Sequence, residues 1–80
     1  MRIVVTGSAG TLGAPLVAEL RERGHEVWGI ELQHTGQRQT IRADVADFRQ
    51  LRAALDRIGD FDLVYPLAAE FVRINGEEQY

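Results

Sequence analysis

Residues 5–13 read VTGSAGTLG and continue an apolar run that begins at Ile3. Gly7, Gly10 and Gly13 recur within this stretch at a regular spacing. In a turn from a strand into a helix, the first glycine permits a tight reversal, the second lets the backbone lie close to a pyrophosphate, and the third lets the helix pack on the strand. The first N–H groups of the helix are then free to hold an anion. The pattern predicts a dinucleotide-binding loop, the alternative being an ordinary glycine-rich turn.

The segments on either side of this loop fit a strand and a helix. Residues 2–6 form a largely apolar run, as expected for a strand buried on both faces of a parallel sheet. Residues 12–23 carry apolar side chains at helical spacing. Pro15 falls in the first turn of this helix, where a missing N–H costs little, and Gly24 follows its end.

The rest of the chain continues the alternation. We expect a strand at 26–31, a loop at 32–39, a strand at 40–43, a helix at 47–58 and a strand at 62–67. The residues after this last strand read as a loop that leads into a helix near 76–80.

The signals for the second helix and the last strand are specific. Asp47 is a predicted N-cap with Gln50 in the capping-box position, and Gly59 ends the helix. Pro66 has no N–H to donate to a neighbouring strand. The last strand therefore ends at Pro66 or turns this position away from a partner.

Right-handed crossovers between these elements give a parallel sheet of order 3-2-1-4 with helices on both faces. The fold class is α/β, half of a Rossmann-like fold that stops after its fourth strand, and residues 1–80 form one domain. The connections diverge between the first and fourth strands, so a crevice is expected there. The segments that meet at this carboxyl edge are the glycine loop, Glu31, Asp44-Val45 and Leu67-Ala68-Ala69.

Composition excludes several other classes of protein. The net charge is −3 and the arginines are scattered, so we expect no nucleic-acid partner. Cysteine is absent, and His25 and His34 lack further ligands at metal spacing, so no metal site is predicted. The apolar runs are too short for a membrane span, and the first residues lack the apolar core of a signal peptide. A cytoplasmic location is therefore expected.

The motifs together resemble those of the extended short-chain dehydrogenases/reductases, in the NAD-dependent epimerase/dehydratase group that acts on nucleotide sugars. They are TGxxGxxG at residues 6–13, the acidic strand end at Glu31, the pair Asp44-Val45, and Leu67-Ala68-Ala69. The resemblance covers essentially the whole chain but only the N-terminal portion of the family. It implies a Rossmann-type domain that binds NAD within an oxidoreductase.

The resemblance also implies roles at the phosphate and ribose end of the cofactor. Backbone N–H groups near Thr11 and Leu12 would hold the pyrophosphate. Glu31 would accept hydrogen bonds from the adenosine ribose, and its charge would repel a 2′-phosphate, which favours NAD over NADP. Glu31 could instead be a solvated strand end. Arg38, in the following loop, could pair with a 2′-phosphate or lie in solvent.

Two further segments are assigned in the same way. The carboxylate of Asp44 would accept from the adenine amino group while the N–H of Val45 meets the ring, although Asp44 could instead cap a turn. Leu67, Ala68 and Ala69 would border the ribose on the nicotinamide side. The alternative is that the alanines are small only because a helix and a strand approach each other there.

The chain departs from the family at two places. Members commonly carry a histidine where this chain has Pro66. Their catalysis rests on a Tyr-x-x-x-Lys pair in which the lysine lowers the tyrosine pKa. Tyr65 is followed four residues later by Ala69, Tyr80 is the last residue, and all nine basic residues are arginine. These 80 residues are therefore predicted to bind cofactor without catalysing a reaction on their own.

Two other functions are compatible with the same sequence. The fourth strand carries Leu63 and Tyr65 and would present an unpaired edge, so the chain could be a scaffold that forms a homodimer through that edge. It could also be a sensing module that binds dinucleotide and changes its association state without turnover.

Overall fold

The computed structural model describes residues 1–33 and 35–68 of the chain. Its elements are β1 (Arg2–Thr6), α1 (Gly13–Glu22), β2 (Glu26–Glu31), β3 (Thr40–Arg42), α2 (Phe48–Ile58) and β4 (Leu63–Pro66). The predicted elements up to residue 67 are confirmed, and no boundary differs by more than a single residue. His34, Ala69 and the helix expected near 76–80 lie outside the described residues.

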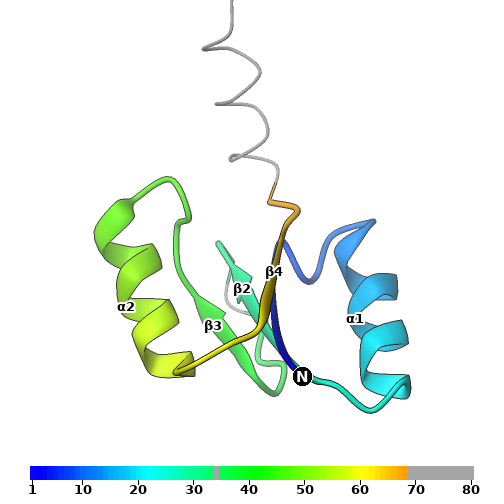
Figure 1. Cartoon of the computed structure of the whole chain (residues 1–80). Coiled ribbons are helices and arrows are strands. Elements are labelled where there is room, and N and C mark those ends of the chain that lie inside the picture. Colours follow the sequence, from blue (N-terminus) through cyan, green and yellow to red (C-terminus); the bar gives the residue numbers. More distant parts are fainter. Residues whose placement is uncertain (34, 69–80) are drawn as a thin grey trace, which may run out of the picture.

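The four strands form one parallel sheet in the order β3-β2-β1-β4, which confirms the predicted topology. The central strand β1 pairs Val4 with Trp28 on one side and with Val64 on the other. Figure 1 shows the sheet nearly edge-on, with α1 and α2 on its opposite faces. The strands run toward the same edge of the sheet, where the loops that follow β1, β2 and β4 come together.

Alternate residues of each strand build a separate core on each face of the sheet. Ile3 and Val5 pack with Val27 and the buried face of α1. Val4 packs instead with Ile30 and the buried face of α2. Since both faces are covered by a helix, β1 needs apolar side chains at successive positions, which explains its continuous apolar run.

The two helices end as the glycines predict but begin differently. Gly24 has a φ of +92°, and hydrogen bonds from the N–H groups of Gly24 and His25 to the carbonyls of Arg21 and Leu20 close α1 in a Schellman motif. At the start of α2, Oδ1 of Asp47 accepts from the N–H groups of Arg49 and Gln50 at 2.9 and 3.3 Å. Leu12 precedes α1 and makes no such side-chain bond.

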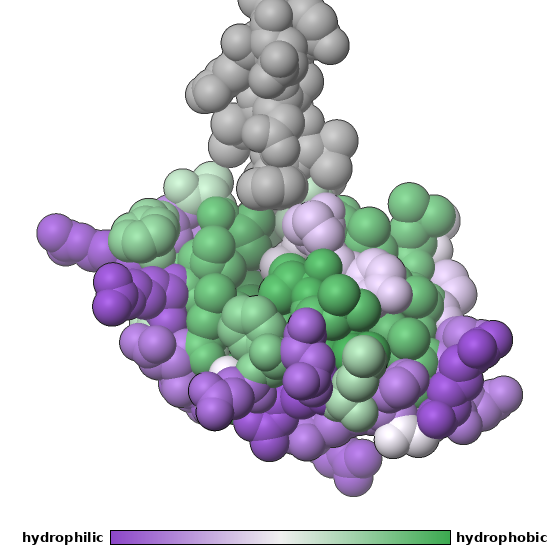
Figure 2. Space-filling model, in the orientation of Figure 1, coloured by the Kyte–Doolittle hydropathy of each residue, from purple (hydrophilic) through white to green (hydrophobic). Residues whose placement is uncertain are grey.

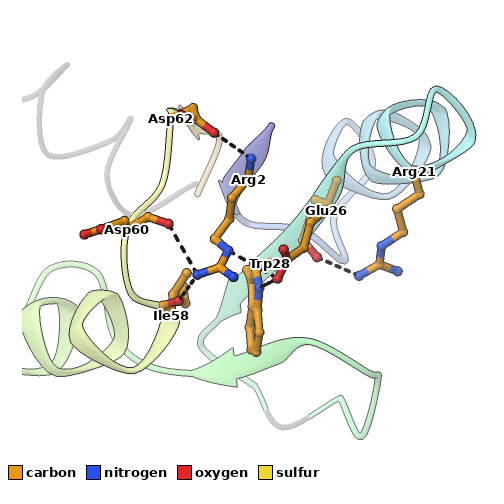
Figure 3. Close-up of polar contacts among 8 residues, drawn as sticks. Arg2, Arg21, Glu26, Trp28, Ile58, Asp60 and Asp62 are labelled. Atoms are coloured by element: carbon orange, nitrogen blue, oxygen red, sulfur yellow. Dashed lines mark hydrogen bonds and ion pairs between the residues drawn. The ribbon is translucent and has the colours of Figure 1, made fainter.

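A polar cluster around Arg2 closes the amino edge of the sheet (Figure 3). The guanidinium of Arg2 donates to the carbonyl of Ile58 at 2.7 Å and to that of Asp60 at 3.3 Å, next to the end of α2. The N–H of Arg2 donates to Oδ2 of Asp62 at 2.8 Å. Arg2 therefore ties the end of α2 and the start of β4 to the first strand.

Glu26 completes this cluster from β2. Its Oε2 accepts from the indole N–H of Trp28 at 2.8 Å and forms an ion pair with Nε of Arg2 at 3.2 Å. The Trp28 hydrogen bond, followed by the Arg2 contact, lowers the pKa of Glu26 below its ordinary value of 4.5. The partly buried Trp28 side chain also packs against the core beneath α2.

Candidate functional site

The glycine loop begins with a backbone turn that only glycine adopts readily. Gly7 has a φ of +74°, and its N–H donates to the carbonyl of Ile30 on the neighbouring strand at 2.9 Å. A Cβ at Gly7 would lie 3.0 Å from the backbone of Leu67 and Ala68. The absence of a side chain at Gly7 therefore lets the end of β4 approach the loop, where the N–H of Ala68 donates to Oγ1 of Thr6 at 3.3 Å.

Gly13 and Gly10 differ in the space around them. A Cβ at Gly13 would lie 2.0 Å from the carbonyl oxygen of Gly7, so α1 can rest on the loop only because this residue lacks a side chain. A Cβ at Gly10 would meet only the same oxygen, at 3.4 Å, and Gly10 does not have a positive φ. The fold itself therefore does not require glycine at residue 10, and the backbone there is open to an approaching molecule.

A cavity of about 380 Å³ lies at the carboxyl edge of the sheet, next to this open backbone. Every predicted site residue within the described part of the chain lines it, namely Gly7, Gly10, Thr11, Leu12, Gly13, Glu31, Asp44, Val45, Leu67 and Ala68. The structure thus brings together segments that are far apart in the sequence, because the carboxyl ends of the parallel strands meet at one edge of the sheet.

Sequence reasoning did not identify all of the lining residues. Ile30, Leu32, Gln33 and Ala43 also contribute to the wall of the cavity. Ile30, Leu32 and Ala43 each lie next to a predicted site residue at a strand end, and Gln33 lies two positions after Glu31. This proximity is the one signal that could have indicated them. Leu12 lies 72% exposed at the start of α1, so the rim of the cavity includes an apolar side chain in contact with solvent.

The half-buried Glu31 ends β2, and its carboxylate points at the glycine loop. Oε2 of Glu31 accepts a hydrogen bond from the N–H of Ala9. Its own carbonyl accepts from the N–H of Ala43 at 2.8 Å, which fixes the backbone at this strand end. Glu31 is therefore not a side chain extended into solvent, and it lies beside the loop that the pyrophosphate was predicted to occupy.

Asp44 lines the cavity and also makes the turn that the alternative interpretation describes. Its Oδ1 accepts from the N–H of Ala46 at 2.9 Å. Its own N–H donates to Oε1 of Gln50 at 2.9 Å, while Nε2 of Gln50 donates to Oδ2 of Asp47 at 3.3 Å. The side chain of Gln50 therefore bonds to the predicted N-cap residue and also to Asp44. These bonds hold Asp44 and the adjacent Val45 in a defined position at the cavity wall.

Ser8 fills the space between the loop and the sheet. It is 6% exposed, and its Oγ has no hydrogen-bond partner among the described residues. A Cβ at Gly29 of β2 would lie 2.1 Å from this Oγ. The loop can therefore lie on β2 only because Gly29 has no side chain, a requirement that neither periodicity nor motif spacing reveals.

The other candidates lie away from the cavity. Arg38 is exposed, and its carbonyl accepts from Arg21 at 3.4 Å. His25 is beside the N-terminal amino group at 3.4 Å, and Tyr65 packs against the core beneath α1. Within residues 1–33 and 35–68, no three acidic or histidine side chains are grouped to hold a metal ion. The described helices are also too short or too polar to cross a membrane.

Comparison with protein families gives a match over almost the whole chain. The model described as "NAD dependent epimerase/dehydratase family" matches residues 3–79. This range includes the glycine loop, both described helices and the four strands except for Arg2, the first residue of β1.

Two curated reductases are similar to parts of the chain. A 4-hydroxy-tetrahydrodipicolinate reductase from Natronomonas pharaonis is 34% identical over 61 residues, which are 76% of this chain and 25% of the reductase. A 3-diazoavenalumate denitrifying reductase from a Streptomyces species is 42% identical over 57 residues, which are 71% of this chain and 17% of that protein. The chain thus corresponds to only a minor part of either reductase.

A solved structure shares the fold. The 3-alpha-hydroxysteroid dehydrogenase from Pseudomonas sp. B-0831, crystallised with NADH, superposes with a TM-score of 0.67 at 36% sequence identity. The match covers 85% of this chain and 30% of the dehydrogenase. The Rossmann-like arrangement inferred from the sequence is therefore shared with a dehydrogenase of known structure.

Proposed function

Because the chain belongs to the NAD-dependent epimerase/dehydratase family, we propose that its cavity binds the ADP portion of NAD. The family and the fold are those of NAD(P)-binding, oxidoreductase-like domains. In this proposal the chain supplies the dinucleotide-binding part of an oxidoreductase that resembles nucleotide-sugar epimerases and dehydratases. NAD would serve there as the acceptor of a hydride from a sugar carbinol.

The open backbone at Gly10 is the observation that carries this proposal. A pyrophosphate has to lie directly against the main chain, and a Cβ at residue 10 would occupy space that no other part of the described fold fills. The adjacent start of α1 supports the same role. Leu12 provides no side-chain cap, whereas Asp47 caps α2. The N–H of Ala14 already donates to the carbonyl of Gly10 at 3.0 Å, and Pro15 has no N–H. The N–H groups without an acceptor among the described residues are therefore those just before them, at Thr11, Leu12 and Gly13. A phosphate anion would satisfy them and would be favoured by the helix dipole.

The remaining lining residues fit the other parts of the cofactor. Glu31 would accept from the ribose hydroxyls and disfavour the 2′-phosphate of NADP. Asp44 and Val45 would contact adenine, and Leu67 with Ala68 and Ala69 would border the second ribose. The chain contains no lysine, so we propose cofactor binding without turnover for these residues alone.

Titration calorimetry of the folded chain with NAD and then with NADP tests this function. Saturable binding that is tighter for NAD than for NADP is expected. Equal affinities would remove Glu31 as the selector, and no heat with either dinucleotide would contradict the binding function itself.

A second candidate function is self-association, and it is favoured by the exposure of β4. Within the described residues, β4 pairs only with β1, and Leu63 and Val64 are 40% and 38% exposed. Figure 2 shows hydrophobic residues gathered where β4 faces the viewer in Figure 1. Two copies could pair their β4 edges and extend both sheets.

Sedimentation velocity separates these functions. A scaffold would form dimers that NAD does not affect, and Val64→Arg would dissociate them without changing dinucleotide binding. A sensing module would show a dimer constant that shifts with NAD, because binding and association are thermodynamically linked. A protein that stays monomeric at all concentrations, with and without NAD, would exclude both the scaffold and the sensing module.

A further inference from the structure

We propose that Glu31 is a positioning residue that holds the glycine loop in its binding conformation before a cofactor arrives. This deepens the proposed function of the same site and rests on it for the consequences on affinity. The effect on the loop itself is a property of the free protein and can be measured without any cofactor.

Two hydrogen bonds join the loop to the end of β2. The backbone N–H of Gly7 donates to the carbonyl of Ile30, and the N–H of Ala9 donates to the carboxylate of Glu31. The first bond continues the sheet, since Thr6 and Ile30 are register partners. The second reaches farther along the loop, to the residue directly before Gly10. Glu31 therefore fixes the part of the loop where the backbone is open.

Glu31 bonds to the glycine loop although a cationic side chain lies on the neighbouring strand. Arg42 of β3 is the register partner of Glu31, and parallel neighbours in register present their side chains on the same face. Within the described residues no ion pair forms between them, and the carboxylate bonds to the N–H of Ala9. A carboxylate bonded to a backbone N–H makes a charge-assisted hydrogen bond, which is stronger than a neutral one.

Besides its packing on β2 and α1, the loop makes few other hydrogen bonds that could hold it. One bond within the loop runs from the N–H of Gly10 to the carbonyl of Gly7 at 3.1 Å, and one from α1 runs from the N–H of Ala14 to the carbonyl of Gly10 at 3.0 Å. The buried hydroxyl of Ser8 has no hydrogen-bond partner among the described residues. Glycine loses more conformational freedom on ordering than other residues, so this loop is costly to fix. An ordered loop binds its ligand more tightly because that cost has already been met.

The same carboxylate can serve both the loop and a ribose. An ionised carboxylate has two oxygens and about four acceptor positions. One oxygen can keep the N–H of Ala9 while the other accepts from ribose hydroxyls. Removing the Glu31 side chain is therefore expected to lower the affinity for NAD, because both the ribose contacts and the order of the loop are lost.

Amide hydrogen exchange at Ala9, followed by NMR in the cofactor-free protein, tests the proposal. Glu31→Ala is expected to speed exchange at Ala9 by about tenfold or more, the equivalent of one hydrogen bond to a charged group. Glu31→Gln keeps an acceptor oxygen at the same reach and is expected to retain part of the protection. Glu22→Ala removes an exposed carboxylate from α1 and serves as the matched control, with no effect at Ala9. Unchanged protection at Ala9 in Glu31→Ala would overturn the proposal.

If Glu31→Ala does not fold, Glu31→Asp and Glu31→Gln provide the same comparison. Aspartate keeps the charge but is one methylene shorter, so Ala9 should lose protection in Glu31→Asp and keep it in Glu31→Gln. The reverse order would contradict a role that depends on reach.

Titration of the same variants with NAD and NADP keeps the two proposals distinct. Glu31→Gln should gain NADP binding with the loop still ordered, whereas Glu31→Ala should bind both dinucleotides weakly. If the wild-type chain binds neither, the proposed function fails while the exchange result stands. If the wild-type chain binds NAD but substitutions at Glu31 leave amide exchange at Ala9 unchanged, only the positioning role fails.

Discussion

Ser8 and Gly29 occupy one site between the glycine loop and the sheet, and only one of them can carry a side chain there. A Cβ at Gly29 would lie 2.1 Å from Oγ and 2.6 Å from Cβ of Ser8. The position of the loop over β2, and with it the position of the cavity, therefore depends on this pair.

Gly29→Ala is expected to lower the free energy of unfolding by about 1–3 kcal/mol, as overpacking of a filled core does. Urea denaturation followed by far-UV circular dichroism measures the change. Ser8→Gly combined with Gly29→Ala moves the side chain from one residue to the other and should recover part of the loss. A Gly29→Ala protein as stable as wild type would show that the loop can move away from β2 at no cost.

Ser8→Ala should stabilise the fold, in contrast to Gly29→Ala. The hydroxyl of Ser8 is buried and has no hydrogen-bond partner among the described residues, and such a group costs about 1–3 kcal/mol relative to a satisfied one. Replacing Oγ by hydrogen is expected to raise the free energy of unfolding by about 1 kcal/mol. The same urea titration applies, and a loss of stability would indicate that a bound water satisfies the hydroxyl.

Substitutions at Gly10 and Gly13 should separate binding from folding. Gly10→Val places a side chain in the open approach to the loop, and we expect NAD affinity to fall by about 100-fold or more with little change in stability. Gly13→Ala places a Cβ 2.0 Å from the Gly7 carbonyl and is expected to destabilise the fold directly. Calorimetry and urea denaturation of both variants check this, with the exposed substitution Ala53→Val as the control. Normal NAD binding by Gly10→Val would contradict the assigned loop.

Glu26, in the polar cluster around Arg2, predicts how the stability of the fold depends on pH. The pKa of Glu26 is lowered in the folded protein, first by the Trp28 N–H and then by Arg2. Its stabilising contribution is therefore complete at pH values above 4.5 and is lost as the pH falls through the lower folded value. Trp28→Phe removes the N–H, so the Glu26 pKa measured by carboxyl NMR should rise toward 4.5. An unchanged Glu26 titration in this variant would assign the shift to Arg2 alone.

The sequence predicted the elements and the sheet order because these follow from local signals. Gly24 and Asp47 mark helix ends by their own backbone preferences, and the crossover rule then orders the strands. The same rule places Glu31, Asp44 and Leu67 at one edge of the sheet, so the candidate site could be predicted from the sequence.

The details that the sequence did not reveal depend on distances between residues far apart in the chain. The bond from Arg2 to Ile58 spans 56 positions, and that from Ala9 to Glu31 spans 22. Periodicity says which face a residue occupies but not how far its side chain reaches. For the same reason the capping-box position of Gln50 predicted its bond to Asp47 but not its further bond to the N–H of Asp44.

The Arg2 cluster lies at the amino edge of the sheet and the cavity at the carboxyl edge, so the contacts that hold the layers together are separated from those proposed to recognise a ligand. Engineering can exploit this division. Substitutions that strengthen the amino edge should make the domain more robust without altering selectivity, and positions at the carboxyl edge with space for a side chain, such as Gly10, should accept diversification without loss of the fold. The domain therefore suits use as a scaffold whose binding preference is selected independently of its thermal tolerance.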